Sequence, residues 1–194
     1  LERLLSYGVT TVELGVQSLD DEVLQKTYRG HTVEDVAQAT RLIRKYPLQL
    51  GYQLMLGLPG DSFSSARLTG ERTVKASPDF VRIYPTLVLQ GTTLFRWYEE
   101  GKYTPWSLQE AVEAASYWWG LFSLYCIPVI RMGLQAAENL APEKDLVAGP
   151  YHPAFGELVE SHLMLEQIIS AFTQLGVRAG DTLNIAFHPR AHSK

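Results

Sequence analysis

The sequence predicts an α/β fold in which parallel strands alternate with helices. Short apolar runs rich in β-branched residues recur through the first half of the chain, and segments with helical spacing of apolar residues separate them. Three of the predicted strands end in a polar or glycine- and proline-rich cluster. Because parallel strands bring their carboxyl ends to the same edge, this order is typical of a barrel of parallel strands with a site at that rim.

Capping and breaking residues delimit the first elements. Apolar residues at helical spacing precede Gly8, which predicts a helix over residues 1–7, and the β-branched run 11–16 predicts a strand. Asp20 can cap the helix that comes next. A threonine followed three residues later by an aspartate then opens a predicted helix over 33–46, which a proline closes.

The middle of the chain continues the alternation. A predicted strand over 48–56 runs into a Gly-Leu-Pro-Gly turn, a helix is expected over 62–76, and a third strand over 78–84. A short helix over 93–100 and a long one over 107–124 follow. The order strand, helix, strand, helix, strand is that of parallel βα units and disfavours a sandwich.

The C-terminal third is less regular. Residues 127–133 predict another strand, 155–175 a long amphipathic helix ended by a glycine, and 181–187 a last strand. The stretch 135–153 is rich in glycine and proline, which makes it the best candidate for an internal boundary.

Composition indicates one substantial core in an ordinary globular protein. The 194 residues are 46% hydrophobic and 20% charged, with a formal net charge of -4. No apolar run is long enough to span a membrane and no secretory leader is visible, so we expect a cytoplasmic protein without a membrane partner. The acidic balance leaves a nucleic acid partner open without indicating one. A local basic cluster is more simply a solvated helix face; it consists of Arg41, Arg44 and Lys45.

Polar and glycine residues at the predicted strand ends are the candidate site residues. The amide of Gln17 can form hydrogen bonds either to a ligand or to polar groups at the strand end. Arg29 can bind a carboxylate through two hydrogen bonds, or it can be a surface arginine after a helix. Gly57 and Gly60 around Pro59 allow close approach of a ligand, but by themselves favour a tight turn.

Other residues are expected to have structural roles rather than to form a site. The single cysteine, Cys126, is expected as a small buried hydrophobe, and the histidines lack the spacing of a metal site. Nucleotide-binding glycine loops and a nucleophile elbow are absent from the sequence. A cluster of aromatic residues is expected in the core; it comprises Trp118, Trp119, Phe122 and Tyr125.

Four motifs in order resemble the second half of a radical S-adenosylmethionine (SAM) enzyme. They are Glu13-Leu-Gly-Val-Gln-Ser18, Arg29-Gly-His-Thr-Val33, Leu56-Gly-Leu-Pro-Gly60, and Tyr84-Pro-Thr-Leu-Val88 with Gly91-Thr92. The resemblance covers about residues 1–134. It is nearest to the radical domain of the Elongator catalytic subunit 3 family, with the oxygen-independent coproporphyrinogen oxidase group as a close relative.

The resemblance implies a partial (β/α)6 TIM-like barrel in the parent protein. There a 4Fe-4S cluster, held by a CxxxCxxC loop, cleaves SAM to a 5'-deoxyadenosyl radical. Residues 1–134 would be the C-terminal half of that barrel, supplying its fourth to sixth strands, and 135–194 a truncated α+β accessory extension.

The same resemblance assigns cofactor contacts to residues of this chain. Gln17 and Arg29 match positions that hold the methionyl carboxylate end of SAM. Gln53 falls where the coproporphyrinogen oxidase group carries an aspartate for the ribose hydroxyls. The residues expected near the adenosine are Gly57, Pro59, Leu87 and Val88.

The sequence departs from the family pattern in ways that bear on activity. The cysteine loop and the Gly-Gly-acidic motif expected after the second strand are absent, so the chain alone should bind no cluster, make no radical, and bind SAM weakly at most. Its partner would be the missing N-terminal half of the barrel. The substrate is not readable, with tRNA or a tetrapyrrole-like molecule suggested by relatives, and residues 135–194 lack an acetyltransferase pattern.

Two other interpretations stay open at this point. The chain could be a stand-alone binding or interaction module without catalysis, and an incomplete barrel would expose strand edges that favour self-association. A barrel enzyme with aldolase-like lysine chemistry is disfavoured, because no lysine falls at a predicted strand end. The lysines in predicted helices or loops are Lys26, Lys45, Lys75, Lys102 and Lys144.

Overall fold

A computed structural model describes residues 1–134, 145–182, 184 and 186 of the chain. The chain forms two compact units, Leu1–Leu163 and Met164–Lys194, and each is described by itself. The domain boundary expected at residue 134 from the sequence stays a prediction.

Within the described residues, the first unit contains all the strands and most of the helices. The strands are β1 (Thr11–Gln17), β2 (Gln49–Leu56), β3 (Phe80–Pro85), β4 (Val88–Leu89), β5 (Val129–Met132) and β6 (Leu146–Ala148). The helices are α1 (Glu2–Ser6), α2 (Asp21–Lys26), α3 (Val33–Ile43), α4 (Phe63–Ala76), α5 (Thr93–Glu99), α6 (Leu108–Leu124) and α8 (Phe155–Leu175), of which α8 continues into the second unit.

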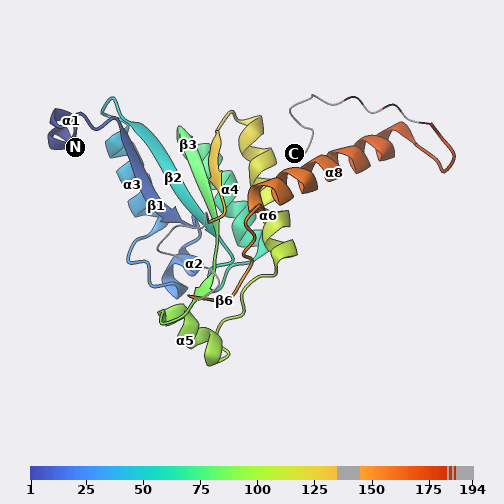
Figure 1. The fold of residues 1–194 in the computed structure, drawn as a ribbon. Coiled ribbons are helices and arrows are strands. Elements are labelled where there is room, and N and C mark those ends of the chain that lie inside the picture. The colour runs from blue at the N-terminus through green and yellow to red at the C-terminus, as the bar shows by residue number, and fades with distance from the viewer. Residues whose placement is uncertain (135–144, 183, 185, 187–194) are drawn as a thin grey trace. The chain divides into compact units, whose positions relative to one another are not determined.

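Four strands form one parallel sheet in the order β1-β2-β3-β5, which confirms the predicted α/β class. Their carboxyl ends therefore lie at one edge, together with α2 and α5 (Figure 1). A short antiparallel pair of β4 and β6 was not predicted. Strands of two and three residues carry too few positions to show a period of two.

Helix starts agree with the capping residues that predicted them. The side chain of Asp20 accepts a hydrogen bond from the first turn of α2, and Thr32 with Asp35 forms a capping box at α3. Ser62 and Ser107 begin α4 and α6 in the same way. The end of α3 lies at Ile43, earlier than the sequence predicted, because the next residues form a turn that leads into β2.

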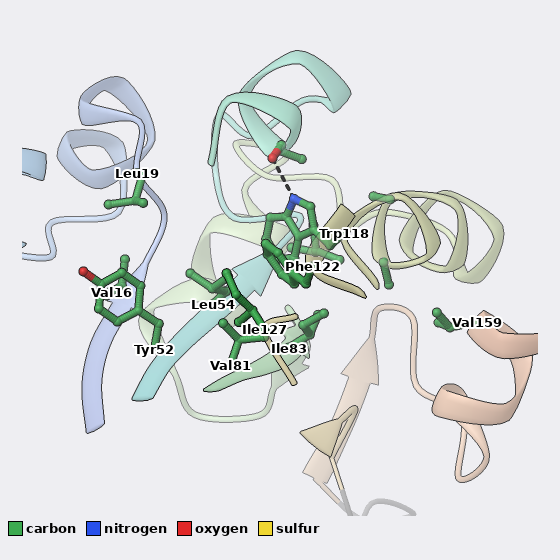
Figure 2. Packing of buried hydrophobic residues seen from close by; sticks show 14 of the residues in the cluster. Val16, Leu19, Tyr52, Leu54, Val81, Ile83, Trp118, Phe122, Ile127 and Val159 are labelled. Atoms are coloured by element: carbon green, nitrogen blue, oxygen red, sulfur yellow. Dashed lines mark hydrogen bonds between the residues drawn. The ribbon is translucent and has the colours of Figure 1, made fainter. Parts of the chain in front are cut away.

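Helices α3, α4 and α6 cover one face of the sheet (Figure 1), and the core lies between. On β2 this face is made by alternate, fully buried side chains, including Leu50, Tyr52 and Leu54. Figure 2 shows Trp118 of α6 within this cluster, its indole N–H donating to the Ala66 carbonyl oxygen at 2.7 Å. The buried indole thus keeps its polar group satisfied.

The predicted burial of two residues after α6 is wrong. Tyr125 is 60% exposed and the thiol of Cys126 is also exposed. The helix ends at Leu124, and Cys126 takes a left-handed backbone conformation with φ of +55°. Both residues thus lie in the turn after the helix, beyond the buried face that holds Trp118.

The second unit begins within α8, which ends at Leu175. Positions 181, 182, 184 and 186 are not in a strand, so the predicted strand over 181–187 is not seen there, while 183, 185 and 187 lie outside the described residues. No helix in the described part of the chain is long and apolar enough to cross a membrane.

Candidate functional site

The face of the sheet opposite the helices carries polar side chains in register. Gln53 of β2 alternates with the buried core residues, so its side chain lies on the open face. Glu13 pairs with Gly51 across β1 and β2, and Gln53 pairs with Arg82 across β2 and β3. This register brings three polar side chains from three strands together.

The Glu13 carboxylate is the centre of this polar cluster. It accepts a hydrogen bond from Gln53 Nε2 at 2.9 Å. Arg82 donates to both carboxylate oxygens, from Nε at 2.9 Å and from Nη2 at 3.0 Å. Both side chains of this ion pair are about one quarter exposed, at 23% for Arg82 and 25% for Glu13. Such a bidentate pair holds a planar geometry more firmly than a single contact.

The pKa of Glu13 lies below its ordinary value. The hydrogen bond from Gln53 is the largest cause, and the hydrogen bonds and charge of Arg82 add to it, with a further contribution from the charge of Arg131. Partial burial acts in the opposite direction. Glu13 is therefore ionised at neutral pH and keeps Gln53 in one orientation, with the amide N–H directed to the carboxylate.

Gln17 lies at the carboxyl end of β1, as the sequence predicted. Its backbone φ is +66°, and its Nε2 sits 2.9 Å from the point where a Cβ on Gly15 would lie. Because Gly15 has no side chain, it leaves room for the Gln17 amide, which lies where a Cβ on Gly15 would otherwise come too close. His31 approaches the same strand end, with Nε2 3.3 Å from the Val16 carbonyl oxygen.

Arg29 reaches over the end of the neighbouring strand. Its Nη2 lies 3.2 Å from the sulfur of Met55, which is on the same open face as Gln53. Partial burial lowers the pKa of the Arg29 guanidinium, which nevertheless stays charged. Across the described residues, no carboxylate forms an ion pair with it. Arg29 is exposed, so its guanidinium at this strand end is accessible to an anion.

The loop after β2 is a closed turn. Gly57 has a φ of +73°, its N–H donates to Asp61 at 2.9 Å, and its carbonyl oxygen accepts from the Tyr103 hydroxyl at 2.6 Å. A Cβ on Gly57 would also lie 3.1 Å from the Trp106 ring. Burial raises the pKa of both Asp61 and Tyr103. Both backbone polar groups of Gly57 are thus in use, which favours the turn interpretation of this motif.

The segment after β3 offers a ligand less than the sequence suggested. Val88 is fully buried and pairs with Ala148, so the predicted adenosine contact of Val88 gains no support from the geometry. Leu87 is half-buried and stays a candidate, as does Pro59. The Thr86 hydroxyl is buried without a hydrogen-bond partner among the described residues.

The residues present do not fit an iron-sulfur cluster. Such a cluster requires cysteine thiolates, and the one cysteine, Cys126, precedes β5 at the opposite edge of the sheet from the site. In the described part of the chain, no group of three histidine, cysteine or acidic side chains is placed to hold a metal ion.

Sequence reasoning missed the partnership of Glu13 and Arg82. Glu13 is the one charged residue of β1 and Arg82 the one charged residue of β3, and the polar Gln53 lies on the same face of β2 between them. That repeated position on neighbouring strands is the signal that could have found the cluster.

Two family models match the chain in succession. The Radical SAM superfamily model matches residues 1–69, and the Radical SAM C-terminal domain model matches residues 78–164. This chain belongs to the radical SAM superfamily. The similarity predicted from the four motifs is therefore confirmed at the level of the superfamily.

Named relatives of this radical SAM chain include tRNA-modifying proteins. The tRNA uridine(34) acetyltransferase of Dehalococcoides mccartyi is 44% identical over 110 residues, which is 55% of this chain and 24% of that protein. Human Elongator complex protein 3 is 32% identical over 123 residues, covering 58% of this chain and 21% of the relative. The chain thus spans about a quarter or less of the length of these relatives.

A solved structure supports the fold of the radical SAM chain. The Elp3 of Methanocaldococcus infernus with an N-terminal deletion has a TM-score of 0.68 and 32% sequence identity, covering 91% of this chain and 38% of that one. The predicted similarity to the Elongator subunit 3 family is confirmed, and the four-stranded parallel sheet matches part of that structure. The similarity to coproporphyrinogen oxidases stays a prediction.

Proposed function

We propose that this chain supplies the strand-end rim on which a radical SAM enzyme binds the methionyl end of SAM. The observation that carries the proposal is the position of Arg29, whose exposed guanidinium lies at the end of β2 beside Met55, without a carboxylate partner among the described residues. The α-carboxylate of SAM is the anion that would complete it, through two parallel hydrogen bonds.

Gln17 and Gln53 would hold the rest of the molecule. The Gln17 amide offers both donor and acceptor atoms at the carboxyl end of β1, the strand next to β2. Glu13 holds one N–H of Gln53, so the other amide atoms of Gln53 are available to a ribose hydroxyl. A neutral carbonyl oxygen accepts such a hydrogen bond, as an aspartate would, and Gln53 is therefore compatible with the role predicted for its position.

The chemistry that SAM supplies when bound to a cluster is the 5'-deoxyadenosyl radical, and one cysteine cannot provide the three thiolates that the cluster needs. The proposed role of this chain is then to bind and orient SAM. We infer that the substrate of the whole protein is a uridine of tRNA. The reason is that a relative with 44% identity is named tRNA uridine(34) acetyltransferase. The shared region is only about a quarter of that relative, so this activity belongs to the proposal.

Isothermal titration calorimetry with SAM tests the proposal on three proteins. The wild type should bind weakly, Arg29→Ala should lose at least about 10-fold in affinity because a charge-assisted pair is removed, and Arg41→Ala should bind as the wild type. Arg41 is a matched control because its ion pair with Glu34 is exposed and lies on α3. Absence of heat with the wild type, or equal affinities of the two arginine variants, would overturn the proposal.

A further inference from the structure

A pocket lies at the same edge of the sheet as the candidate SAM site. Its volume is about 530 Å³, and we call it the rim pocket. It is lined by Lys26, Tyr28, Pro59, Gly60, Trp97 and Lys102. These residues come from α2 and the turn after it, the turn after β2, α5, and the segment that follows α5 (Figure 1).

Two aromatic rings form one wall of the rim pocket. Tyr28 and Trp97 meet edge to face, with ring centroids 5.7 Å apart. Tyr28 is 81% exposed, although a large aromatic side chain gains most from burial. Its backbone is left-handed with φ of +52°, a conformation that costs a non-glycine residue of the order of 1 kcal/mol. Apart from the contact with Trp97, neither burial nor backbone preference favours a tyrosine at this position.

A cation completes the rim pocket. The Lys26 side chain lies across Gly60 so closely that a Cβ on this glycine would be 2.3 Å from Lys26 Cδ. Among the described residues no carboxylate pairs with Lys26, whereas Lys102 is already paired with Glu100 at 2.7 Å. The lysine stem is thus held by contact with the turn, and its ammonium group is available at the pocket.

We propose that the rim pocket binds one nucleotide of single-stranded RNA, with the base stacked on the exposed ring of Tyr28, which Trp97 supports edge to face, and a phosphate at Lys26. Exposed aromatic rings next to unpaired cations are the combination that recognises unstacked bases on a charged backbone. The pocket volume is within the range of small-ligand sites. The inference rests on the proposed function for its choice of RNA, and it deepens that function by naming the residues that would contact the substrate strand.

Fluorescence anisotropy with a 5'-labelled octauridylate tests the rim pocket at low salt. Tyr28→Asn removes the ring and suits the left-handed backbone, so it should keep the fold and weaken binding by about 5- to 100-fold. Tyr28→Phe should bind as the wild type, since the ring stacks without its hydroxyl. Lys26→Gln should weaken binding and lower the slope of log affinity against log salt by about 0.7.

The control is Tyr7→Ala, because Tyr7 is another exposed tyrosine, 74% exposed, at the end of α1. It should bind octauridylate as the wild type, and an RNA duplex of equal length should bind more weakly than the single strand. Wild-type affinity in Tyr28→Asn, or absence of binding to the wild type at low salt, would overturn the inference. Equal affinity for the single strand and the duplex would also overturn the inference, because it would show that charge alone drives binding.

SAM calorimetry on the Tyr28→Asn variant separates this inference from the proposed function. The variant should bind SAM as the wild type does. If octauridylate binding depends on Tyr28 while neither the wild type nor any variant binds SAM, the proposed SAM site fails and the rim pocket stands. If SAM binding depends on Arg29 while octauridylate ignores Tyr28, the rim pocket fails and the SAM site stands.

Discussion

The two faces of the parallel sheet are built on different principles. On the helix-covered face, alternate residues of β2 such as Leu50 and Leu54 are fully buried and apolar. On the open face, Gln53 of the same strand joins Glu13 and Arg82 in hydrogen bonds of defined geometry. Burial is non-directional and stabilises the fold, whereas directed polar contacts fix side-chain orientation at modest net stability. Mutations on the two faces should therefore separate folding from ligand binding.

The largest effect is expected from Trp118→Ala on the helix-covered face. Trp118 is completely buried, and its indole N–H satisfies the Ala66 carbonyl (Figure 2). Truncation leaves a cavity and an unpaired carbonyl, which should lower the free energy of unfolding by about 3–5 kcal/mol. Urea denaturation followed by circular dichroism measures this loss. Trp97→Ala is the control, because Trp97 is only half-buried and should cost clearly less.

A smaller effect is expected from Glu13→Ala on the open face. The substitution leaves the Arg82 guanidinium without its bidentate partner, and it releases the Gln53 amide. Because the pair is about one quarter exposed, solvent should limit the loss to about 1–2 kcal/mol in urea denaturation. The double variant Glu13→Ala, Arg82→Met should recover part of this loss. A loss as large as that of Trp118→Ala would contradict the division between the two faces.

The helix-covered face was largely predictable from the sequence. Its signals are local: apolar runs gave β2 and β3 within one or two residues, and the capping residues Asp20 and Thr32 gave helix starts. The error after α6 has a local cause as well, since the apolar run through Cys126 hides a left-handed turn that no glycine marks. Apolar composition predicts burial only while the helix continues.

The candidate site was predictable only in part. Gln17 and Arg29 could be singled out because each stands at a strand end or just beyond a helix, which the chain order reveals. The contact of Glu13 with Arg82 joins residues 69 positions apart, and it depends on the register of three strands that only the structure gives. The rim pocket was hidden for the same reason, since Tyr28 and Trp97 meet through tertiary packing.

The smallest expected effect is the pH dependence of the Glu13 cluster. The pKa of Glu13 in the folded protein lies below its ordinary value of 4.5. Its contribution to stability is therefore complete above that value, and it is lost as the pH falls through the folded-state pKa. Urea denaturation from pH 7 to pH 3 should show the stability advantage of the wild type over Glu13→Gln shrinking only below about pH 4.5. Taking this difference cancels the titration of the other carboxylates. An advantage that is constant over the whole range would mean that the charge of Glu13, and with it the ion pair to Arg82, contributes nothing to the open face.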